Sequence, residues 1–142
     1  MIDKDIEESL TIYERACSQC IDDLYHVAYL ALVDADKAEK MVTKVCVSGV
    51  HKYADIKDEI EIRYYLTDDL YHLCRRRLWF VTPATDKLPE PLQIMTKTER
   101  LLAAMWFVSG LSTAGSGKIV GMMPDQYRTV ISALMKKISI SV

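Results

Sequence analysis

Two cysteines in this chain have a spacing that supports chemistry. Cys17 and Cys20 are separated by two residues, an arrangement used by redox-active dithiols and by zinc sites. A zinc site needs two further ligands nearby, whereas Cys46 and Cys74 stand alone in the sequence. Because residues i and i+3 of a helix share one face, we expect buried, reduced thiols at this motif and no metal.

A glycine-rich stretch, Gly-Ser-Gly-Lys at residues 115–118, has some of the character of a phosphate-binding loop. The Walker pattern requires a glycine where Ser112 stands and a hydroxyl residue where Ile119 stands, and no strand precedes the stretch. We therefore expect a flexible turn here rather than a nucleotide site.

The remaining polar groups form no catalytic pattern. The three histidines lie on different segments, and the acidic pairs near residues 59–61 and 68–69 have no partner histidine. Solvated helix faces account for such pairs. The sequence gives no positive reason to expect an enzyme, and it predicts no catalytic residue, cofactor or metal ligand.

A cluster of arginines, Arg75, Arg76 and Arg77, is followed closely by Trp79 and Phe80. Positive charge next to aromatic rings can hold a single strand of nucleic acid through its backbone and stacked bases. The alternative is a basic helix end, favoured by the helix dipole, with Trp79 covering the core.

Composition limits the fold and the partners. The chain has 142 residues, half of them apolar, and a net charge of −2, so it can form a core but is not a strongly basic nucleic-acid binder. Residues 1–80 carry a net charge of −5 and residues 81–142 a net charge of +3. The N-terminus does not resemble a signal peptide, and no apolar run reaches the ~20 residues of a membrane span. We therefore expect a cytoplasmic protein.

Hydrophobic periodicity predicts an all-α fold. Residues 1–80 contain one glycine and no proline, and apolar stripes predict four helices around residues 6–17, 21–33, 38–46 and 60–79. The Asp-Ala-Asp break at residues 34–36 is expected to cap the third helix. Four helices of this length form an antiparallel bundle. Three prolines at residues 83, 89 and 91 then predict a linker over residues 81–94.

Residues 95–142 predict a unit of three helices. A capping box at residues 96–99 begins the first, a short second helix ends near Gly121, and Pro124 opens the last. The last two have the layout of a helix-turn-helix, in which the second helix lies in the major groove of DNA. The alternative is a three-helix packing unit without a ligand.

The last fifty residues align without a gap to a known signature. The matching segments are Gly-Leu-Ser at 110–112, Ile-Val-Gly-Met-Met at 119–123, Tyr-Arg-Thr-Val-Ile at 127–131 and Lys-Lys-Ile at 136–138. They resemble the C-terminal promoter-reading domain of bacterial RNA polymerase sigma factors of the small two-domain extracytoplasmic-function type. The segments at 24–28 and 38–44 resemble the N-terminal domain of the same family.

The resemblance implies a sigma region 2-like domain over residues 1–80 and a region 4-like domain over residues 95–142. Core RNA polymerase and promoter DNA are the implied partners, and a regulatory protein of the anti-sigma type is compatible with the resemblance. In the family, the third helix docks on polymerase, which here implicates Ala38, Glu39, Met41 and Val42. The implied DNA-binding residues are Arg75, Arg76, Arg77, Trp79, Lys118, Asp125, Gln126, Arg128, Thr129, Ser132, Lys136 and Lys137. Among them, Gln126, Arg128 and Thr129 would contact bases or nearby phosphates, and Lys118, Lys136 and Lys137 would contact phosphates.

The chain also departs from the family pattern. Lys40 and Lys44 stand at acidic positions, Val130 and Ala133 replace arginines, and residues 115–117 replace Glu-Ile-Ala. Because glycine is unfavourable inside a helix, we expect the helix before Gly121 to be short, frayed or remodelled. These departures favour a second hypothesis, a sigma-like helical protein that acts through protein contacts without binding promoters. A third hypothesis is a DNA-binding regulator that acts without polymerase.

Overall fold

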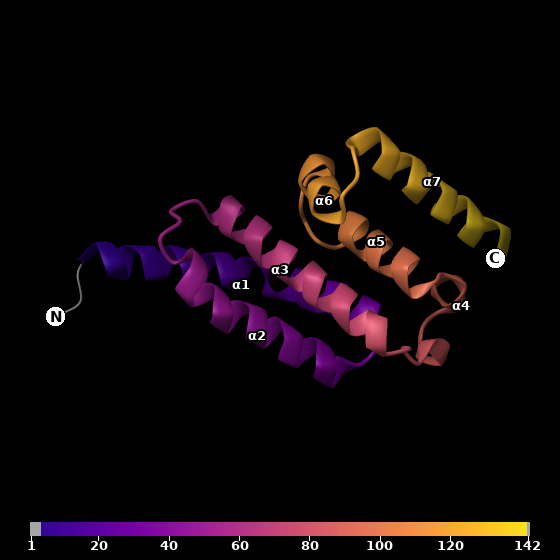
Figure 1. Ribbon diagram of the computed structural model, residues 1–142, viewed down its shortest axis with the longest axis horizontal. Helices are drawn as coiled ribbons and strands as arrows, with labels where there is room; N and C mark the ends of the chain where they lie inside the picture. Colours follow the sequence, from indigo (N-terminus) through magenta and orange to yellow (C-terminus); the bar gives the residue numbers. More distant parts are fainter. Residues whose placement is uncertain (1–3, 142) are drawn as a thin grey trace.

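The computed structural model describes residues 4–141 of the chain, and the side chains of residues 11–139. Within this range the fold is all-α, as predicted (Figure 1). The long helices are α1 (Lys4–Leu32), α2 (Ala35–Tyr53), α3 (Glu59–Phe80), α5 (Lys97–Phe107) and α7 (Pro124–Ser141). The shorter elements are a 3-10 turn, η1 (Thr85–Lys87), and the helices α4 (Glu90–Gln93) and α6 (Thr113–Val120).

The prediction of four helices in the N-terminal part was wrong, because the first two form one continuous helix, α1. No glycine or proline lies between residues 4 and 32 to end it. The buried residues on the two predicted stripes follow one another at spacings of three and four, from Tyr13 through Cys20 to Ala31. The stripes therefore form one face of a single helix, and the N-terminal part contains three long helices.

Each of the next two helices begins at an aspartate cap. The Asp34 carboxylate accepts from the backbone N–H of Lys37 at 3.0 Å at the start of α2, and Asp58 accepts from Ile60 N–H at 2.9 Å at the start of α3. These bonds satisfy N–H groups that have no partner within the helix. Val33, with φ 53°, has a left-handed conformation between α1 and α2, which allows a turn of only two residues.

The three long helices approach one another closely at Gly49 of α2. A Cβ atom at this position would lie 2.3 Å from the hydroxyl of Tyr13 in α1 and 2.8 Å from a methyl group of Leu66 in α3. The hydroxyl of Tyr13 donates to the backbone carbonyl of Cys46 at 2.5 Å. Glycine is therefore required at position 49 by packing rather than by backbone conformation.

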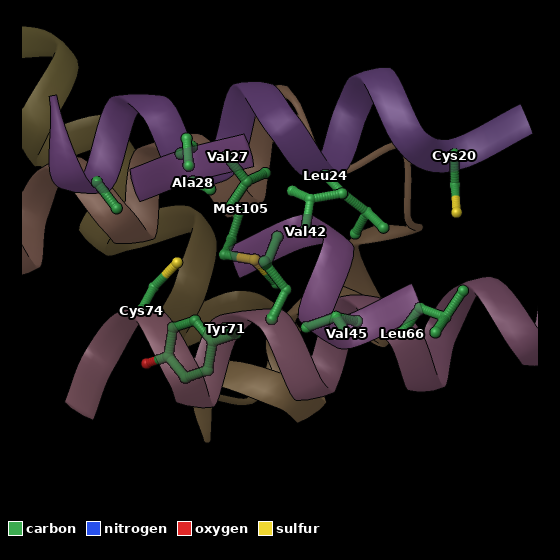
Figure 2. Close-up of a cluster of buried hydrophobic side chains, with 14 of the residues drawn as sticks. Cys20, Leu24, Val27, Ala28, Val42, Val45, Leu66, Tyr71, Cys74 and Met105 are labelled. Carbon is green, nitrogen blue, oxygen red and sulfur yellow. The ribbon is translucent and has the colours of Figure 1, made fainter. Parts of the chain in front are cut away.

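The C-terminal helices share the main core with α1–α3. Leu101, Ala104 and Met105 of α5 and Ile119 of α6 belong to the same buried cluster as residues of the first three helices. Figure 2 shows Met105 amid the side chains of this cluster. A second, smaller cluster holds α7 against α4 and α5. The residues before and after the predicted linker are thus joined by a continuous apolar core.

The segment between α3 and α5 has some helical structure of its own. η1 and α4 lie within the predicted linker, and Pro89 precedes α4 at the N-cap position while Pro91 stands in its first turn. Among the described residues, no helix is long and apolar enough to cross a membrane.

Candidate nucleic-acid interface

Helix α6 is short, as expected, with 8 residues, but it is capped at both ends rather than frayed. The flexible turn expected at residues 115–118 was wrong, because these residues lie within α6. At its start, the hydroxyl of Ser112 accepts from the backbone N–H of Gly115 at 3.0 Å. At its end, Gly121 adopts a left-handed conformation (φ 80°, ψ 30°), and its N–H donates to the carbonyl of Gly117. Met122 N–H donates to the same carbonyl at 2.8 Å. Caps at both ends offset the poor helix propensity of the two glycines.

Gly117 permits the tight connection between α6 and α7. A Cβ atom here would lie 2.8 Å from the backbone oxygen of Met122, a contact that no rotation of a side chain can relieve. Three residues after Gly121, Pro124 begins α7 as predicted. The turn between the two helices is therefore short and determined by backbone geometry.

The orientation of α7 is determined by its buried face, which carries Tyr127, Ile131 and Leu134. Tyr127 is 0 % exposed, and its hydroxyl donates to the carbonyl of Leu102 at 3.0 Å and lies 3.1 Å from the hydroxyl of Ser116. The indole ring of Trp106 meets the Tyr127 ring edge-on, with ring centroids 4.8 Å apart. These contacts join α5, α6 and α7 around one side chain.

The opposite face of α7 is exposed and polar. All seven residues of α7 that the resemblance implicates in DNA binding lie on the surface: Asp125, Gln126, Arg128, Thr129, Ser132, Lys136 and Lys137. The structure thus places these side chains on one accessible helix.

Internal partners reduce the free positive charge of this face. Arg128 pairs with Asp125 at 2.9 Å, and Lys137 pairs with Glu99 at 2.9 Å. The hydroxyl of Thr129 donates to the backbone carbonyl of Asp125 at 2.9 Å. Exposed pairs of this kind contribute about 1 kcal/mol or less, so a phosphate could replace the carboxylates at small cost.

Lys118 lies on α6 rather than with the α7 cluster. Its ammonium group is 6.0 Å from the centre of the Tyr64 ring in α3, within the range of a cation–π contact. Of the residues predicted to contact phosphate, Lys118 is therefore the one directed toward the N-terminal helices.

The arginine cluster lies at the end of α3. Arg75, Arg76 and Arg77 are exposed, and Trp79 is 80 % exposed. The alternative in which Trp79 covers the core is therefore wrong, because Leu78 is the buried residue of this turn. The ammonium group of Lys97 donates to the carbonyl of Leu78 at 2.5 Å and ties the end of α3 to the start of α5.

The four residues predicted to contact polymerase do not share one surface. Ala38 and Val42 are buried in the main core, so their side chains are not available to a partner. Glu39 is exposed and Met41 is partly buried. Residues four apart on a helix share a face, and here Ala38 and Val42 form the face of α2 that packs on the bundle.

Sequence reasoning missed Arg100, which is 2 % exposed. Its guanidinium donates to the carbonyls of Leu30 at 2.6 Å and Ala31 at 3.2 Å, at the end of α1. Burial lowers the pKa of this group, while the negative end of the helix dipole favours its charge. Sequence periodicity alone could not reveal this role, because the carbonyls that Arg100 binds lie about seventy residues earlier in the chain.

The cysteines form no metal centre, and no cluster of His, Cys, Asp and Glu among the described residues could hold a metal ion. Cys20 and Cys74 are buried, whereas Cys17 and Cys46 are partly buried. A hydrogen bond with Cys46 lowers the pKa of the Cys17 thiol to about 7, and burial raises the pKa of Cys20 to about 11. The two cysteines of the CxxC motif therefore have different surroundings. Cys17 interacts with Cys46 of α2, whereas Cys20 is buried.

Comparison of the chain with protein families, with curated proteins and with solved structures finds no match.

Proposed function

We propose that the chain is a sigma-factor-like transcription regulator. In this account α7 enters the major groove of promoter DNA, and the N-terminal helices contact core RNA polymerase through the exposed part of α2 around Glu39 and Met41. The proposal rests on the resemblance of residues 110–138 to the family's promoter-reading signature.

The structural observation that best supports the proposal is that α7 has one buried apolar face and one exposed polar face. Its buried side is anchored by Tyr127, and its exposed side presents Gln126, Arg128 and Thr129 in its first turns. A recognition helix contacts base edges through its N-terminal residues. Glutamine and arginine have the donor geometry to read adenine and guanine edges. The tight turn at Gly121 supports a helix-turn-helix arrangement of α6 and α7.

The charge of this surface predicts weak binding of DNA by the chain alone. Phosphate neutralisation supplies most of the non-specific affinity for DNA, and both Arg128 and Lys137 already face carboxylates. The chain would therefore depend on polymerase to bring α7 to its site.

A second candidate function is a protein-contact regulator without promoter binding. The observation that favours it is the apolar core shared by the N-terminal and C-terminal helices, in which α5 packs on α1 and α3. Arg100 of α5 also binds the last carbonyls of α1. A conventional sigma factor bridges two separated promoter elements with its two domains. Here such bridging would require the core between α5 and α1 to open.

Binding to purified core RNA polymerase separates the two functions. The wild-type chain should bind immobilised polymerase, and Glu39→Lys should weaken binding about tenfold, because it reverses the exposed charge at the proposed contact. The control, Lys57→Glu, changes a loop far along the chain and should bind as wild type does. Absence of wild-type binding would reject the polymerase function and leave the protein-contact candidate.

A further inference from the structure

An open groove lies between the first half of α2 and the last turns of α3, which run side by side in opposite directions (Figure 1). Its volume is about 490 Å³. Leu32, Met41 and Leu73 form an apolar floor. This volume is within the range of sites that bind ligands larger than a single ion.

Five cations surround this floor. Lys37, Lys40 and Lys44 line the α2 side, and Arg76 and Arg77 line the α3 side. No carboxylate lines the groove, although Asp36 and Glu39 border a neighbouring hollow on the outer side of α2. Among the described residues none of the five cations forms an ion pair.

The three lysines have no evident role in the fold. Lys37 stands in the first turn of α2, where the helix dipole disfavours cations, and Lys40 and Lys44 follow one and two turns later. Across the groove they also face Arg76 and Arg77, and like charges at close range repel. Cations that oppose both effects indicate a surface suited to an anionic partner.

Exposed aromatic rings stand at one end of the groove. Phe80 is 84 % exposed and lines the groove, and Trp79 lines an adjoining hollow with Phe80 and Arg76. Large apolar side chains on the rim of a polar surface mark contact sites for other molecules. The groove thus offers both apolar area and positive charge.

We propose that this groove binds an acidic amphipathic helix of a partner protein. The apolar face of such a helix would cover Met41, Leu73 and Phe80, and its carboxylates would face the lysines and arginines on both sides. Apolar residues at positions i, i+3, i+4 and i+7 are the usual anchors of a helix in a groove. Charge complementarity would determine which helices bind and how fast.

The floor distinguishes this partner from a single strand of nucleic acid. Bases stack on flat aromatic or guanidinium surfaces, which Phe80, Arg76 and Arg77 offer only at the sides of the groove, whereas its floor consists of leucines and a methionine. Methionine in a groove adapts to varied apolar partners. The groove does not include α7, so this inference does not depend on DNA binding by α7. The groove does share Met41 with the proposed polymerase contact and Arg76 and Arg77 with the residues implicated in DNA binding, so an acidic helix bound there would compete with both.

Binding of synthetic peptides to the full chain tests the inference. The probe is a fluorescein-labelled peptide of three heptads, with leucines on one face of the helix and glutamates elsewhere. A peptide of the same composition with its leucines distributed around the helix is the first comparison, and oligothymidylate of similar length is the second. Fluorescence anisotropy at constant salt gives the three affinities.

The amphipathic peptide should bind wild type about tenfold more tightly than the scrambled peptide. Lys40→Glu/Lys44→Glu should reduce its affinity by about tenfold or more. Phe80→Ala should also reduce it, because the ring contributes apolar contact area. The controls Lys57→Glu, Phe107→Ala and Arg128→Ala, all outside the groove, should bind the peptide as wild type does.

Thermal unfolding would test whether the charge-reversed variant is folded. Because it relieves repulsion across the groove, Lys40→Glu/Lys44→Glu should melt at or above the wild-type temperature in low salt. Equal affinities for the amphipathic and scrambled peptides, or no binding of either, would overturn the proposal. Tighter binding of oligothymidylate, lost in the same variants, would instead identify a single-strand site.

Discussion

The hydroxyl of Tyr127 lies 3.1 Å from the hydroxyl of Ser116, in a buried space between α5, α6 and α7. Tyr127 donates its proton to Leu102 O at 3.0 Å, and Ser109 donates to Met105 O at 2.5 Å. The hydroxyl of Ser116 also lies 3.2 Å from Met105 O, so its one proton can go to that carbonyl or to Tyr127. Ser116 and Tyr127, both in the proposed helix-turn-helix, therefore belong to one buried hydrogen-bond network with carbonyls of α5.

Removal of the Tyr127 hydroxyl should destabilise the fold. Tyr127→Phe leaves the buried carbonyl of Leu102 without its side-chain donor, while the hydroxyl of Ser116 can still donate to Met105 O. The cost is about 1–3 kcal/mol in the free energy of unfolding. Urea denaturation followed by circular dichroism measures this change. Tyr29→Phe, at a partly buried position on α1, should shift the free energy by less than about 0.5 kcal/mol. Equal effects of both variants would contradict the network.

Alkaline pH should weaken the fold through buried tyrosine and cysteine side chains. Burial raises the pKa of Tyr127 and of Cys74 to about 12, from ordinary values of 10.0 and 9.0. The unfolded chain then loses these protons at lower pH than the folded chain. Their contribution to stability is therefore fully present below about pH 9 and is lost as the pH rises toward 12.

Tyr127→Phe isolates one part of this pH dependence. A raised pKa of this size corresponds to about 2–3 kcal/mol, lost in the wild type between about pH 10 and 12. The slope of unfolding free energy against pH should therefore be shallower in Tyr127→Phe over this interval. An unchanged slope would show that Tyr127 ionises as readily in the folded chain as in the unfolded one.

Loss of Arg100 should weaken the attachment of α5 to the end of α1 and so destabilise the fold. Arg100→Ala removes the donors to the carbonyls of Leu30 and Ala31 and leaves a cavity in a buried site. We expect a loss of about 2–4 kcal/mol in the free energy of unfolding. Arg128→Ala, at an exposed pair, should cost less than about 1 kcal/mol. A small effect of Arg100→Ala in chemical denaturation would mean that the guanidinium is not buried in solution.

The close approach at Gly49 can be tested with a single methyl group. Gly49→Ala would place a Cβ atom against Tyr13 and Leu66, and overpacking of this kind costs about 1–3 kcal/mol. Alanine is otherwise the better helix former by about 1 kcal/mol, so a destabilised variant would establish the contact. Ser48→Ala on the exposed side of α2 should be neutral or slightly stabilising. The two variants can be compared by their thermal midpoints.

Local signals in the sequence predicted the helix ends well. Asp34 caps α2, Thr96 and Glu99 form the expected capping box, and Pro124 begins α7. Each of these signals depends on hydrogen bonds or backbone angles within a few residues. The same local reasoning allowed for fraying in α6, because it weighed the glycines at 115 and 117 without the hydrogen bonds of the Ser112 and Gly121 caps.

Features that depend on distant contacts were not predictable in this way. The continuity of α1 is a different case with a local cause. No glycine or proline ends the helix between residues 4 and 32, although two apolar stripes suggested two helices. The burial of Arg100 depends on carbonyls about seventy residues earlier in the chain. Lys40 and Arg76 line the same groove between α2 and α3, and no pattern along one helix reveals this arrangement.

Selection of DNA by the chain bound to core RNA polymerase tests the central claim most directly. Random duplex DNA is incubated with polymerase and the wild-type chain, and the retained sequences are determined. We predict that one sequence motif is enriched and that Gln126→Ala/Arg128→Ala abolishes the enrichment, since each base contact discriminates by about 1–3 kcal/mol. Lys57→Ala should enrich the same motif as wild type. No motif with the wild type, or the same motif with the double variant, would contradict promoter reading by α7.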